Sequence, residues 1–479
     1  MKTSKKLLTI SMLAVLGAVS LTGCGGKGKT KTDPSKTVVF WHTFGKENLA
    51  MIEEMKKEFL KLPENKGMSI ELLNQGGYTD INDKLLKAIA PKNLPTMAIC
   101  YPDHVADYLR AGVVEELSPY VTASEAASAE NENDPYHFNS EEYIASFWQE
   151  GKEYDTKGSL YSVPFSKSTE VMFYNKTFFD ANQLSVPTTW AEVEETCAKI
   201  LQIESVKNTK DYDAPLGYDS DDNLFITFCQ QLGIPYTSLK EDGTGSFDFN
   251  NDQAKEMVQT VKRWYDSKYI KTKGLLGNNT YTSTKFTEQK LHMTIGSTGG
   301  TRYNSPSNGA FEVGVAPLPQ WSKDEAPACI SQGPSIVFFN EGKYASKQQK
   351  ECAWRFYTYI TSAENSAKYA ALTGYEPVRS TSYTTSIYEA RLAIYKDNVN
   401  ANTPEAAEIR KSTDYLYSAV ANLTETLQSW YFTSPVFVGS ATARNQVGAI
   451  IPAVCAGENP KSIAEAFNEA MTKCVLAAM

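Results

Sequence analysis

A glycine- and lysine-containing segment near the N-terminus has the spacing of a phosphate-binding loop. Gly23, Gly28, Lys29 and Thr30 fit the pattern G-x-x-x-x-G-K-[ST], whose backbone N–H groups cradle phosphate. Such a loop has to follow a buried strand and open a helix, so that the helix dipole also points at the phosphate. Here residues 1–20 begin with lysines and continue as an apolar run, and the residues after the motif include a proline and open no helix. We therefore expect that this segment binds no nucleotide.

The same region has the parts of a secretory signal. Three lysines in the first six residues precede the apolar run Leu7–Val19, which is too short to span a bilayer core of roughly 30 Å. The segment Leu21–Cys24 resembles the lipobox of bacterial lipoproteins, which implies cleavage before Cys24 and a diacylglyceryl group on its sulfur; two acyl chains anchor stably where one does not. The alternative is an ordinary signal peptide with an incidental cysteine. The prediction is a lipoprotein signal peptide at 1–23 and a flexible tether at 24–36.

Composition places the mature chain among globular proteins of two lobes or domains. Removing 23 of the 479 residues leaves 456, which is long for one simple core. Without the three signal-peptide lysines, the 47 basic residues fall to 44 against 56 acidic ones, a net charge of −12. This acidic balance, with no basic run after the tether, argues against nucleic acid as a partner. No later apolar run approaches transmembrane length.

The number and spacing of the cysteines favour buried, unpaired side chains over a disulfide framework. Seven remain after Cys24, and their odd number excludes complete pairing. No C-x-x-C occurs, and Cys100 lies in the apolar run "MAICY". We interpret the cysteines as small buried hydrophobic residues, while a single Cys455–Cys474 disulfide stays open.

The other reactive side chains show no catalytic or metal-binding motif. The histidines, His42, His104, His137 and His292, form no H-E-x-x-H or other close pair, and no G-x-S-x-G occurs. The segment "DSDDN", residues 219–223, lacks the glycine and the final glutamate of a calcium loop, so we interpret it as a solvated loop. Paired carboxylates for glycoside hydrolysis stay open, because their geometry depends on the fold. We expect no metal, no cofactor and no catalytic residue.

Strands and helices alternate from the start of the mature chain. "TVVFWH", Thr37–His42, is a β-branched and aromatic run that predicts a strand, and residues 47–62 have the apolar spacing of a helix. A second strand in "MSIELL", Met68–Leu73, completes a βαβ unit, so a parallel sheet begins the fold. A helix at 81–89 and a strand in "TMAICY", Thr96–Tyr101, follow.

Capping boxes predict three later helix starts. In each, a hydroxyl side chain and a carboxylate three residues later satisfy backbone N–H groups of the first turn. The pairs are Thr189 with Glu192, Thr361 with Glu364, and Ser462 with Glu465. The alternation of strands and helices predicts the α/β class. Residues 122–134, which are acidic and rich in Ala, Ser and Asn, predict a surface excursion.

Seven short stretches resemble one known family, in the same order along the chain. They begin near Val38 and the similarity continues to the C-terminus: "VFWHTF", "GGYTDIND", "YSVPFSKSTEVMFYNKTFF", "VPTTWAEV", "KFTEQKLHMTIGSTGG", "VGVAPLPQ" and "ALTGYEPVRSTSY". On these stretches the chain resembles family 1 extracellular solute-binding proteins, the receptors of carbohydrate ABC importers. It is most similar to their glycerol-3-phosphate-binding branch.

The resemblance implies a two-lobed, periplasmic-binding-protein-like α/β fold with a hinge and an interlobe cleft that closes on ligand. The chain would cross between the lobes near Ser166, near Gln332 and near Pro377. Lobe 1 would comprise residues 37–166 plus 332–376, and lobe 2 residues 167–331 plus 377–479.

The resemblance also implies ligand contacts. Aromatic faces suit the C–H faces of a sugar, and fixed polar groups suit its hydroxyls. Positions that match contacts of the branch are Tyr78 in the Gly-Gly-Tyr loop, Ser297, Gly333 and Tyr375. Trp190, at a helix start beside the cleft, and Trp41, at a strand end, are further candidates for stacking on a ligand. Core packing is the alternative for both tryptophans.

At two contact positions this chain departs from the branch. A serine of the crossover segment falls on Lys167, with Ser168 next to it. An acidic contact after the strand "AICY" falls on Pro102, with Asp103 adjacent. We therefore take Lys167, Ser168 and Asp103 as candidate ligand contacts.

A third departure concerns phosphate. The arginine that would hold phosphate in the branch falls on Phe437, which is taken as a candidate contact. An anion without a bidentate arginine loses its best partner, although Lys167, Arg379 or Arg444 could replace it. This substitution favours an uncharged sugar or polyol conjugate over a free phosphomonoester.

We therefore expect a non-catalytic, monomeric receptor that captures a carbohydrate-type solute (sugar, polyol conjugate or glycerol phosphate) and delivers it to ABC permease subunits. The lipid on Cys24 would hold it at the cell membrane, facing outside the cytoplasm. Two alternatives are a surface-anchored carbohydrate-active enzyme, which would need a carboxylate pair facing the cleft, and a sensory sugar receptor.

Overall fold

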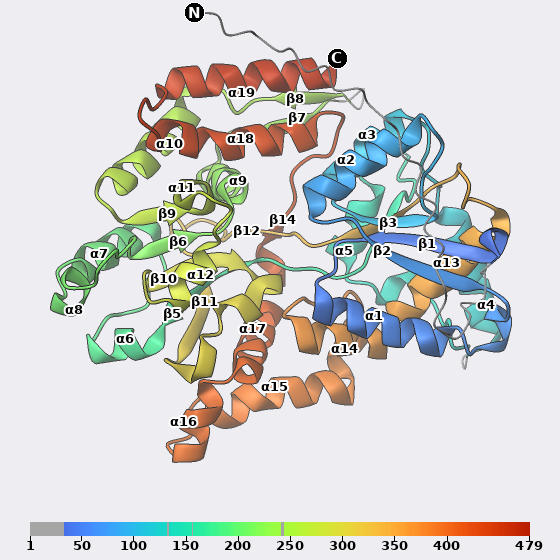
Figure 1. Cartoon of the computed structure of the whole chain (residues 1–479), viewed down its shortest axis with the longest axis horizontal. Coiled ribbons are helices and arrows are strands. Elements are labelled where there is room, and N and C mark those ends of the chain that lie inside the picture. The colour runs from blue at the N-terminus through green and yellow to red at the C-terminus, as the bar shows by residue number, and fades with distance from the viewer. Residues whose placement is uncertain (1–32, 132–133, 156, 241–243) are drawn as a thin grey trace, which may run out of the picture.

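The computed structural model describes residues 33–131, 134–155, 157–240 and 244–479, which form two lobes, each built on a five-stranded sheet (Figure 1). The predicted signal peptide, Cys24 and most of the predicted tether lie outside the described residues. The end of the tether is described: Pro34–Lys36 forms a 3₁₀ turn. Within the described ranges, no helix combines the length and the apolar character that crossing a membrane requires.

The first sheet contains the predicted βαβ unit. Its strand order is β2 (Ser69–Asn74), β1 (Thr37–His42), β3 (Met97–Cys100), β13 (Ser335–Phe338) and β4 (Ser162–Pro164). β1 pairs in parallel with β2 and β3, and β13 pairs antiparallel with β3 and β4. β1 is buried along nearly its whole length, as a parallel strand covered on both faces should be. The helices of this lobe are α1 (Lys46–Phe59), α2 (Tyr78–Ile89), α3 (Pro102–Arg110), α4 (Ser118–Glu130), α5 (Ala145–Gln149), α13 (Lys347–Ile360) and α14 (Ala363–Thr373).

The second sheet mixes parallel and antiparallel pairs. Its order is β11 (Val313–Pro317), β5 (Glu170–Asn175), β10 (Met293–Ser297), β6 (Leu216–Tyr218) and β9 (Ile270–Thr272). A small hairpin, β7 (Thr237–Leu239) and β8 (Gly245–Phe247), lies beside α19. The helices of this lobe are α6 (Lys176–Ala181), α7 (Trp190–Ile200), α8 (Glu204–Lys207), α9 (Asp221–Leu232), α10 (Asp252–Asp266), α11 (Lys273–Leu276), α12 (Thr282–Thr287), α15 (Ser386–Asn398), α16 (Pro404–Arg410), α17 (Thr413–Leu427), α18 (Ser440–Cys455) and α19 (Ile463–Ala478).

Two of the three predicted capping boxes are confirmed. The boxes that begin at Thr189 and Ser462 open α7 and α19. The prediction at Thr361 was wrong by one residue: Thr361 ends α13, and Ser362 caps α14 by accepting a hydrogen bond from the backbone N–H of Asn365. Thr361 is held by α13 instead, because its hydroxyl donates to the Tyr357 carbonyl one turn earlier.

The predicted surface excursion at 122–134 is largely helical. α4 covers most of it and buries only Ser128, so this Ala- and Ser-rich segment lies on the surface as a helix.

Each lobe has its own hydrophobic core. The larger cluster lies between the second sheet and its helices, and the first lobe has separate clusters on the two faces of its sheet. The seven cysteines after Cys24 are all buried and free, as predicted. Cys455 and Cys474 belong to the core of the second lobe, and no disulfide joins them.

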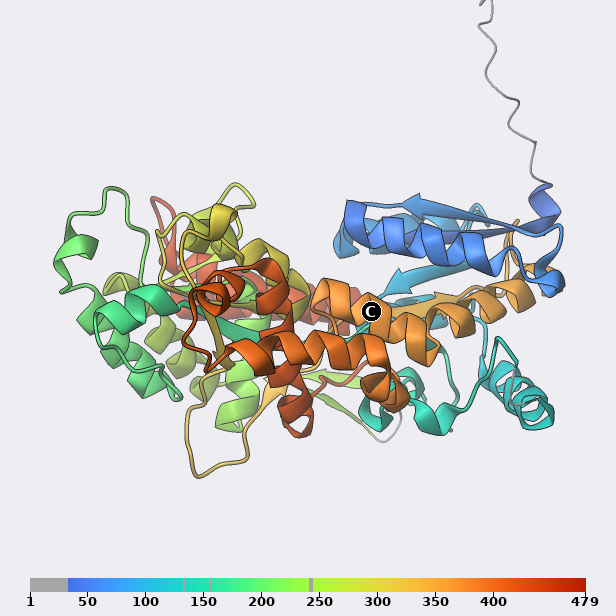
Figure 2. The same ribbon diagram turned by 90° about the horizontal axis from the view of Figure 1, so that it is seen from below.

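The chain passes between the two sheets three times. It runs from β4 to β5, returns from β12 (Cys329–Ile330) to β13, and crosses again between α14 and α15. At the crossing, Lys167 forms an antiparallel bridge with Glu376, and Ser168 forms one with Gln332. A short strand, β14 (Tyr431–Phe432), pairs with β12 beside them. The helices α14 and α15 are in contact and lie below the gap between the sheets in Figure 1; in Figure 2, which is seen from below, they lie toward the viewer. The lobe limits themselves stay a prediction.

Candidate functional site

Two adjoining cavities lie between the lobes. Cavity A has a volume of about 120 Å³ and is enclosed by both lobes and the crossover segment. Cavity B has a volume of about 350 Å³ and lies between α2 and α3 on one side and α9, α11 and α18 on the other. Both are lined by Tyr101, Asp103, Ser220, Asp222 and Arg444. Cavity A is further lined by Pro102, Glu150, Glu153, Asn223, Tyr236, Thr237, Ser331, Gln332, Gly333, Thr433, Ser434, Pro435, Val436 and Ser440. Cavity B is further lined by Tyr78, Thr79, Asn82, Asp83, His104, Asp219, Asp221, Lys273, Ala441, Asn445 and Gly448.

Helix starts bring carboxylates to the cleft. α3 follows β3, and Pro102 at its first position has a backbone already suited to a helix start. Asp103 lies in the first turn, where the helix dipole stabilises a negative charge. α9 follows β6 and is capped by Ser220, so Asp222 also lies in a first turn. Both carboxylates thus follow the carboxyl ends of strands, where α/β folds usually bind ligands.

Arg444 connects the two lobes. It extends from α18, and its Nε donates to Asp103 Oδ2 on the first lobe at 3.2 Å. Its Nη1 donates to Asp222 Oδ2 at 3.2 Å and to Asn223 Oδ1 at 2.7 Å, both on its own lobe. Burial by itself lowers the pKa of Arg444, but the neighbouring Asp222 and Asp103 carboxylates more than offset this and raise it. Arg444 therefore stays charged and separates cavity A from cavity B.

A polar network leads from Arg444 into the second lobe. The Asn223 amide donates to Glu170 Oε1 and to Gln332 Oε1, each at 2.9 Å. The Tyr218 hydroxyl donates to the other oxygen of Glu170. Burial raises the pKa of Glu170 to about 7. Because Gln332 belongs to the crossover segment, the network joins the cleft to the hinge region.

Tyrosines line the first-lobe side of cavity B. Tyr78, at the first position of α2, stacks on Tyr101 with ring centroids 4.0 Å apart and an interplanar angle of 17°. Burial raises the pKa of both hydroxyls, so they stay neutral donors and acceptors at physiological pH. The Tyr375 ring covers Gly299, where an added Cβ would lie 2.6 Å from the ring. Such rings suit the apolar faces of a polyhydroxylated ligand.

Some of the predicted contact residues line the cavities, and others lie beside them at the crossover. Tyr78, Asp103 and Gly333 line the cavities. Ser297 and Ser168 lie at the crossover, where the Ser297 hydroxyl donates to the Ser168 hydroxyl at 3.3 Å. Like Tyr375 and Trp41, these two serines line neither cavity.

The backbone conformation at position 333 favours glycine. Its φ is +107°, a region that side chains rarely adopt. A Cβ there would lie 2.6 Å from the Ser166 carbonyl oxygen and 2.9 Å from Lys167 Cα. The glycine therefore lets two crossover strands approach each other closely at the edge of cavity A.

Two predicted aromatic contacts belong to the core of the second lobe. Trp190 is fully buried among Phe228, Trp264 and Trp321, and its Nε1 donates to Gln231 at 2.9 Å. The alternative of core packing therefore holds for Trp190. Phe437 likewise turns away from the cavities and packs on Phe247 of β8, with ring centroids 5.4 Å apart. Only its neighbours 433–436 line cavity A.

The predicted cationic contacts are held by buried partners. Lys167 has no exposed surface, forms an ion pair with Glu150 and lies 5.9 Å from the Phe147 ring centroid. Glu150 also accepts a hydrogen bond from Ser331 at 3.0 Å and lines cavity A. Lys167 thus positions Glu150 and does not itself reach the cavities.

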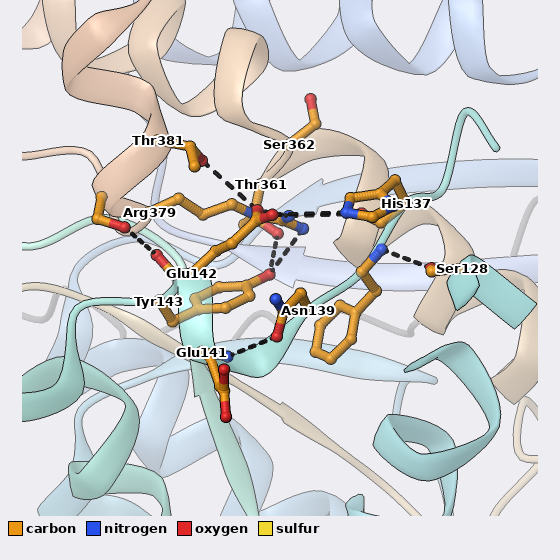
Figure 3. A network of polar contacts seen from close by, with 12 residues as sticks. Ser128, His137, Asn139, Glu141, Glu142, Tyr143, Thr361, Ser362, Arg379 and Thr381 are labelled. Carbon is orange, nitrogen blue, oxygen red and sulfur yellow. Dashed lines mark hydrogen bonds and ion pairs between the residues drawn. The ribbon is translucent and has the colours of Figure 1, made fainter. Parts of the chain in front are cut away.

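Arg379, just after the last crossover, lies in a separate network with residues of the first lobe (Figure 3). Its guanidinium donates to Glu142 Oε2 at 3.1 Å and to the Tyr143 hydroxyl at 3.3 Å, and it lies over the Tyr143 ring. The same hydroxyl is hydrogen-bonded to Thr361 at the end of α13. These contacts tie the segment before α5 to the last crossover, so Arg379 does not replace the phosphate-binding arginine of the branch.

Several cleft residues were missed by sequence reasoning. The interpretation of residues 219–223 as a solvated loop was wrong, since this segment starts α9 and places Asp222 and Asn223 in the cleft. Its position directly after a strand was the available signal. Glu150 and Glu153 had no local signal. Among the described residues, no cluster of three or more His, Cys, Asp or Glu side chains is suited to a metal ion.

Comparison with known proteins shows one consistent similarity. A family model described as bacterial extracellular solute-binding protein matches residues 50–397. The sn-glycerol-3-phosphate-binding periplasmic protein UgpB of Escherichia coli K12 is 24% identical over 389 residues, covering 78% of this chain and 81% of that protein. UgpB of Shigella flexneri serotype 5b gives the same values.

Solved structures show the same architecture. UgpB from Mycobacterium tuberculosis, in complex with glycerophosphocholine, matches with a TM-score of 0.70 at 18% identity, covering 92% of this chain and 98% of that chain. The GacH receptor of Streptomyces glaucescens, solved unliganded and with acarbose, matches with a TM-score of 0.65 at 17% identity, covering 92% and 99%. At these identities the similarity shows the fold, which is the two-lobed α/β fold that the sequence predicted.

Proposed function

The chain belongs to the bacterial extracellular solute-binding protein family, and from this premise we propose that it is a lipid-anchored receptor that delivers a carbohydrate-type solute to an ABC importer. The family prediction from the sequence is thereby confirmed. Its family and its structural neighbours are binding proteins, so the chain is a receptor and not an enzyme.

One observation carries the proposal: the cavities between the lobes are closed by groups from both. Arg444 of the second lobe and Asp103 of the first meet between cavity A and cavity B. A ligand that touches both lobes favours the closed form, because only that form makes all of its contacts. Tyr78, Asp103 and Gly333 are the proposed contacts among the predicted residues, joined by Tyr101, Asn223 and Arg444. Ser168, Ser297 and Tyr375 are proposed to act beside the crossover.

The solute class is supported by the relatives. Curated relatives are named for sn-glycerol-3-phosphate, and structural neighbours were solved with glycerophosphocholine and with acarbose. All of these ligands carry several hydroxyl groups or phosphate-ester oxygens. A sugar, a polyol conjugate or a glycerol phosphate is therefore the proposed range of solutes.

A thermal-shift screen tests the receptor function. Purified protein is heated with a panel of sugars, glycerophosphocholine and sn-glycerol-3-phosphate. A ligand at 100 times its Kd should add roughly 2.7 kcal/mol of stability. Tyr101→Ala should abolish the shift, whereas Tyr359→Ala, at a tyrosine that lines neither cavity, should preserve it. A panel with no binder, or sustained conversion of a bound sugar, would contradict the proposal.

Uptake measurements distinguish a transport receptor from a sensory receptor. Cells that lack this protein should lose uptake of the labelled ligand found in the screen. Unchanged uptake with loss of a transcriptional response would favour the sensory receptor.

Anchoring through Cys24 is proposed from the lipobox alone. Cys24→Ala should release folded protein from the membrane fraction, and Thr30→Ala, six residues on in the tether, should not. Equal retention of both variants would contradict lipid attachment. A monomer with lobes at 37–166 plus 332–376 and at 167–331 plus 377–479 completes the proposal.

A further inference from the structure

We infer that the cleft selects a polyhydroxylated solute that carries a protonated amine, and that it rejects phosphomonoesters. The inference rests on the proposed receptor function and narrows its ligand class. It follows from the charges that line the cavities, the partners of the cleft cations, and the groups left without a partner.

Carboxylates outnumber cations around both cavities. Cavity A is lined by Asp103, Glu150, Glu153 and Asp222, against Arg444 as its only described lining cation and Lys167, which is paired with Glu150 behind the lining. Cavity B shares two of these carboxylates and adds Asp83, Asp219 and Asp221, against one further cation, Lys273. Because the low-dielectric walls of a cleft focus such a field, a cation is attracted to it and an anion is repelled.

The cations of the cleft already have partners. Arg444 donates to Asp103, Asp222 and Asn223. The Lys273 ammonium lies 3.9 Å from the centroid of the Tyr281 ring. A phosphate at Arg444 would have to displace its partners, and doing so would leave Asp103 and Asp222 unpaired next to it. A phosphate at Lys273 would lie beside the Asp219 and Asp221 carboxylates of the same cavity.

Two ionisable side chains of the cleft, Asp103 and His104, have a buried atom without a partner, as does the Thr237 hydroxyl of cavity A. Asp103 Oδ1 is buried and has no hydrogen bond within the described residues. His104, of which 8% is exposed, lines cavity B, and its Nδ1 is buried and unpartnered. The His104 Nε2 faces Asp103 Oδ1 at 3.9 Å. With its proton on Nε2, the ring therefore offers Nδ1 as an acceptor.

Glu153 adds a third acceptor, in cavity A. It is half-buried, and its carboxylate makes no hydrogen bond or ion pair with a described residue. Burial, and to a smaller extent the nearby Glu150, raise the pKa of Glu153, while Lys167 lowers it. A ligand ammonium would donate to these acceptors and neutralise the excess charge, whereas a phosphate offers oxygens to groups that need donors.

The stacked tyrosines support the same class. The faces of Tyr78 and Tyr101 lie at the border of cavity B and are electron-rich, so they attract a cation as well as C–H groups. Hydroxyl groups of the solute would bond the polar groups that remain, including the unpartnered Thr237 hydroxyl in cavity A. The amine supplies charge recognition, and the hydroxyls supply orientation.

Matched ligands on two carbon frames test the inference. Calorimetry at low salt compares glucosamine, glucose and glucose-6-phosphate, and separately aminopropanediol, glycerol and sn-glycerol-3-phosphate. On at least one frame, the amine should bind at least tenfold more tightly than the neutral compound, and the phosphate should not bind. Raising the salt concentration should weaken binding of the amine and leave the affinity for the neutral compound unchanged, because salt screens the charges.

A variant identifies the groups responsible. Glu153→Gln removes a charge that has no partner, so folding should be preserved. It should lower amine affinity roughly tenfold to 150-fold, the range for a hydrogen bond to a charged group, and leave the neutral compound unaffected. Glu71→Gln, on the exposed side of β2, is the matched control and should change neither.

The outcomes separate the two proposals. Phosphate binding as tight as amine binding, equal affinity of amine and neutral compounds, or no binding on either frame overturns the inference. If a neutral sugar of the wider thermal-shift panel then binds, the receptor function stands without the amine preference. If nothing in either panel binds, the receptor function fails as well.

Discussion

Arg444→Met should shift the protein toward an open form. Methionine keeps much of the side-chain volume, but the charge and all three hydrogen bonds are lost. Asp222 and Asn223 lie on the same lobe as Arg444, so opening the cleft leaves those two contacts intact. The contact with Asp103 is the one that opening breaks. The effect on closure therefore comes from that single contact.

Its magnitude follows from its burial. The side chains of Arg444 and Asp103 are 24% and 13% exposed, so the pair is far drier than a surface ion pair. Hydrogen bonds to charged groups contribute about 1.5–3 kcal/mol. We take the lower end, about 1.5 kcal/mol, because opening gives both charges back to water. This is roughly a tenfold change in the ratio of closed to open molecules.

The assay is small-angle scattering without and with saturating ligand, together with calorimetry. The unliganded variant should have a larger radius of gyration than the wild type. Its ligand affinity should be lower by about tenfold from the added cost of closure, and the loss of a proposed ligand contact adds to this. Saturating ligand should restore the compact form in both proteins.

A matched control uses an exposed ion pair between the lobes. Arg302 contacts Glu47 at 3.0 Å, but the two side chains are 54% and 59% exposed. Such pairs contribute about 0–1 kcal/mol, so Arg302→Met should change the radius and the affinity little. Equal radii and equal affinities for the wild type and Arg444→Met would refute the reasoning. An effect of Arg302→Met as large as that of Arg444→Met would refute it too.

Three further predictions concern stability. Gly333→Ala should lower the free energy of unfolding in urea by about 2 kcal/mol or more, because φ is +107° and the new Cβ would clash with the Ser166 carbonyl. The control Gly112→Ala, at φ +73° in open space, should lower it less. Equal losses of stability in the two variants would contradict the clash. Burial raises the pKa of Glu376 from its ordinary value of 4.5 to about 7, so its stabilising contribution is complete below pH 4.5 and is lost as the pH rises through 7. The stability of Glu376→Gln relative to wild type should therefore rise between pH 5 and pH 8, and a constant difference would count against it. Trp190→Phe should lower the free energy of unfolding by about 1–3 kcal/mol and leave ligand affinity unchanged. Weaker ligand binding at unchanged stability would indicate that Trp190 contacts the ligand.

The histidines explain why the Glu376 prediction is a difference between two proteins. Burial lowers the pKa of His42 and of His292 to about 4. These buried neutral rings make the folded state more stable as the pH rises from 4 toward 6.5, which opposes the effect of Glu376. Because both proteins contain the same histidines, their contribution cancels in the comparison.

Much of the fold could be predicted from local patterns. The β-branched run at Thr37–His42 is β1, and the box at Thr189 caps α7. The error at Thr361 shows the limit of such patterns, because two hydroxyl residues stand side by side and only the end of α13 decides which one caps α14. Strand and helix preferences act within a few residues, so they are visible in a sequence.

The candidate site was predictable only in part. The family resemblance pointed to Tyr78, Asp103 and Gly333, and all three line the cavities, while ligand binding by them stays a prediction. Trp190 and Phe437 line neither cavity, because an aromatic side chain packs equally well into a core or against a sugar. Lys167 lines neither cavity because it is buried against Glu150 of the first lobe, 17 positions earlier in the chain.

The sequence by itself determined the family and the α/β class of this protein, through the order of seven short stretches and the alternation of strands and helices. Only the tertiary structure decided which side chains meet in the cleft. Asp103 and Arg444 are 341 positions apart and lie on different lobes, yet they form the contact between the two cavities. Such a pair depends on how two separately folded lobes come together, and the energy of each charge depends on its burial. Neither quantity is set by neighbouring residues, so no local pattern contains it.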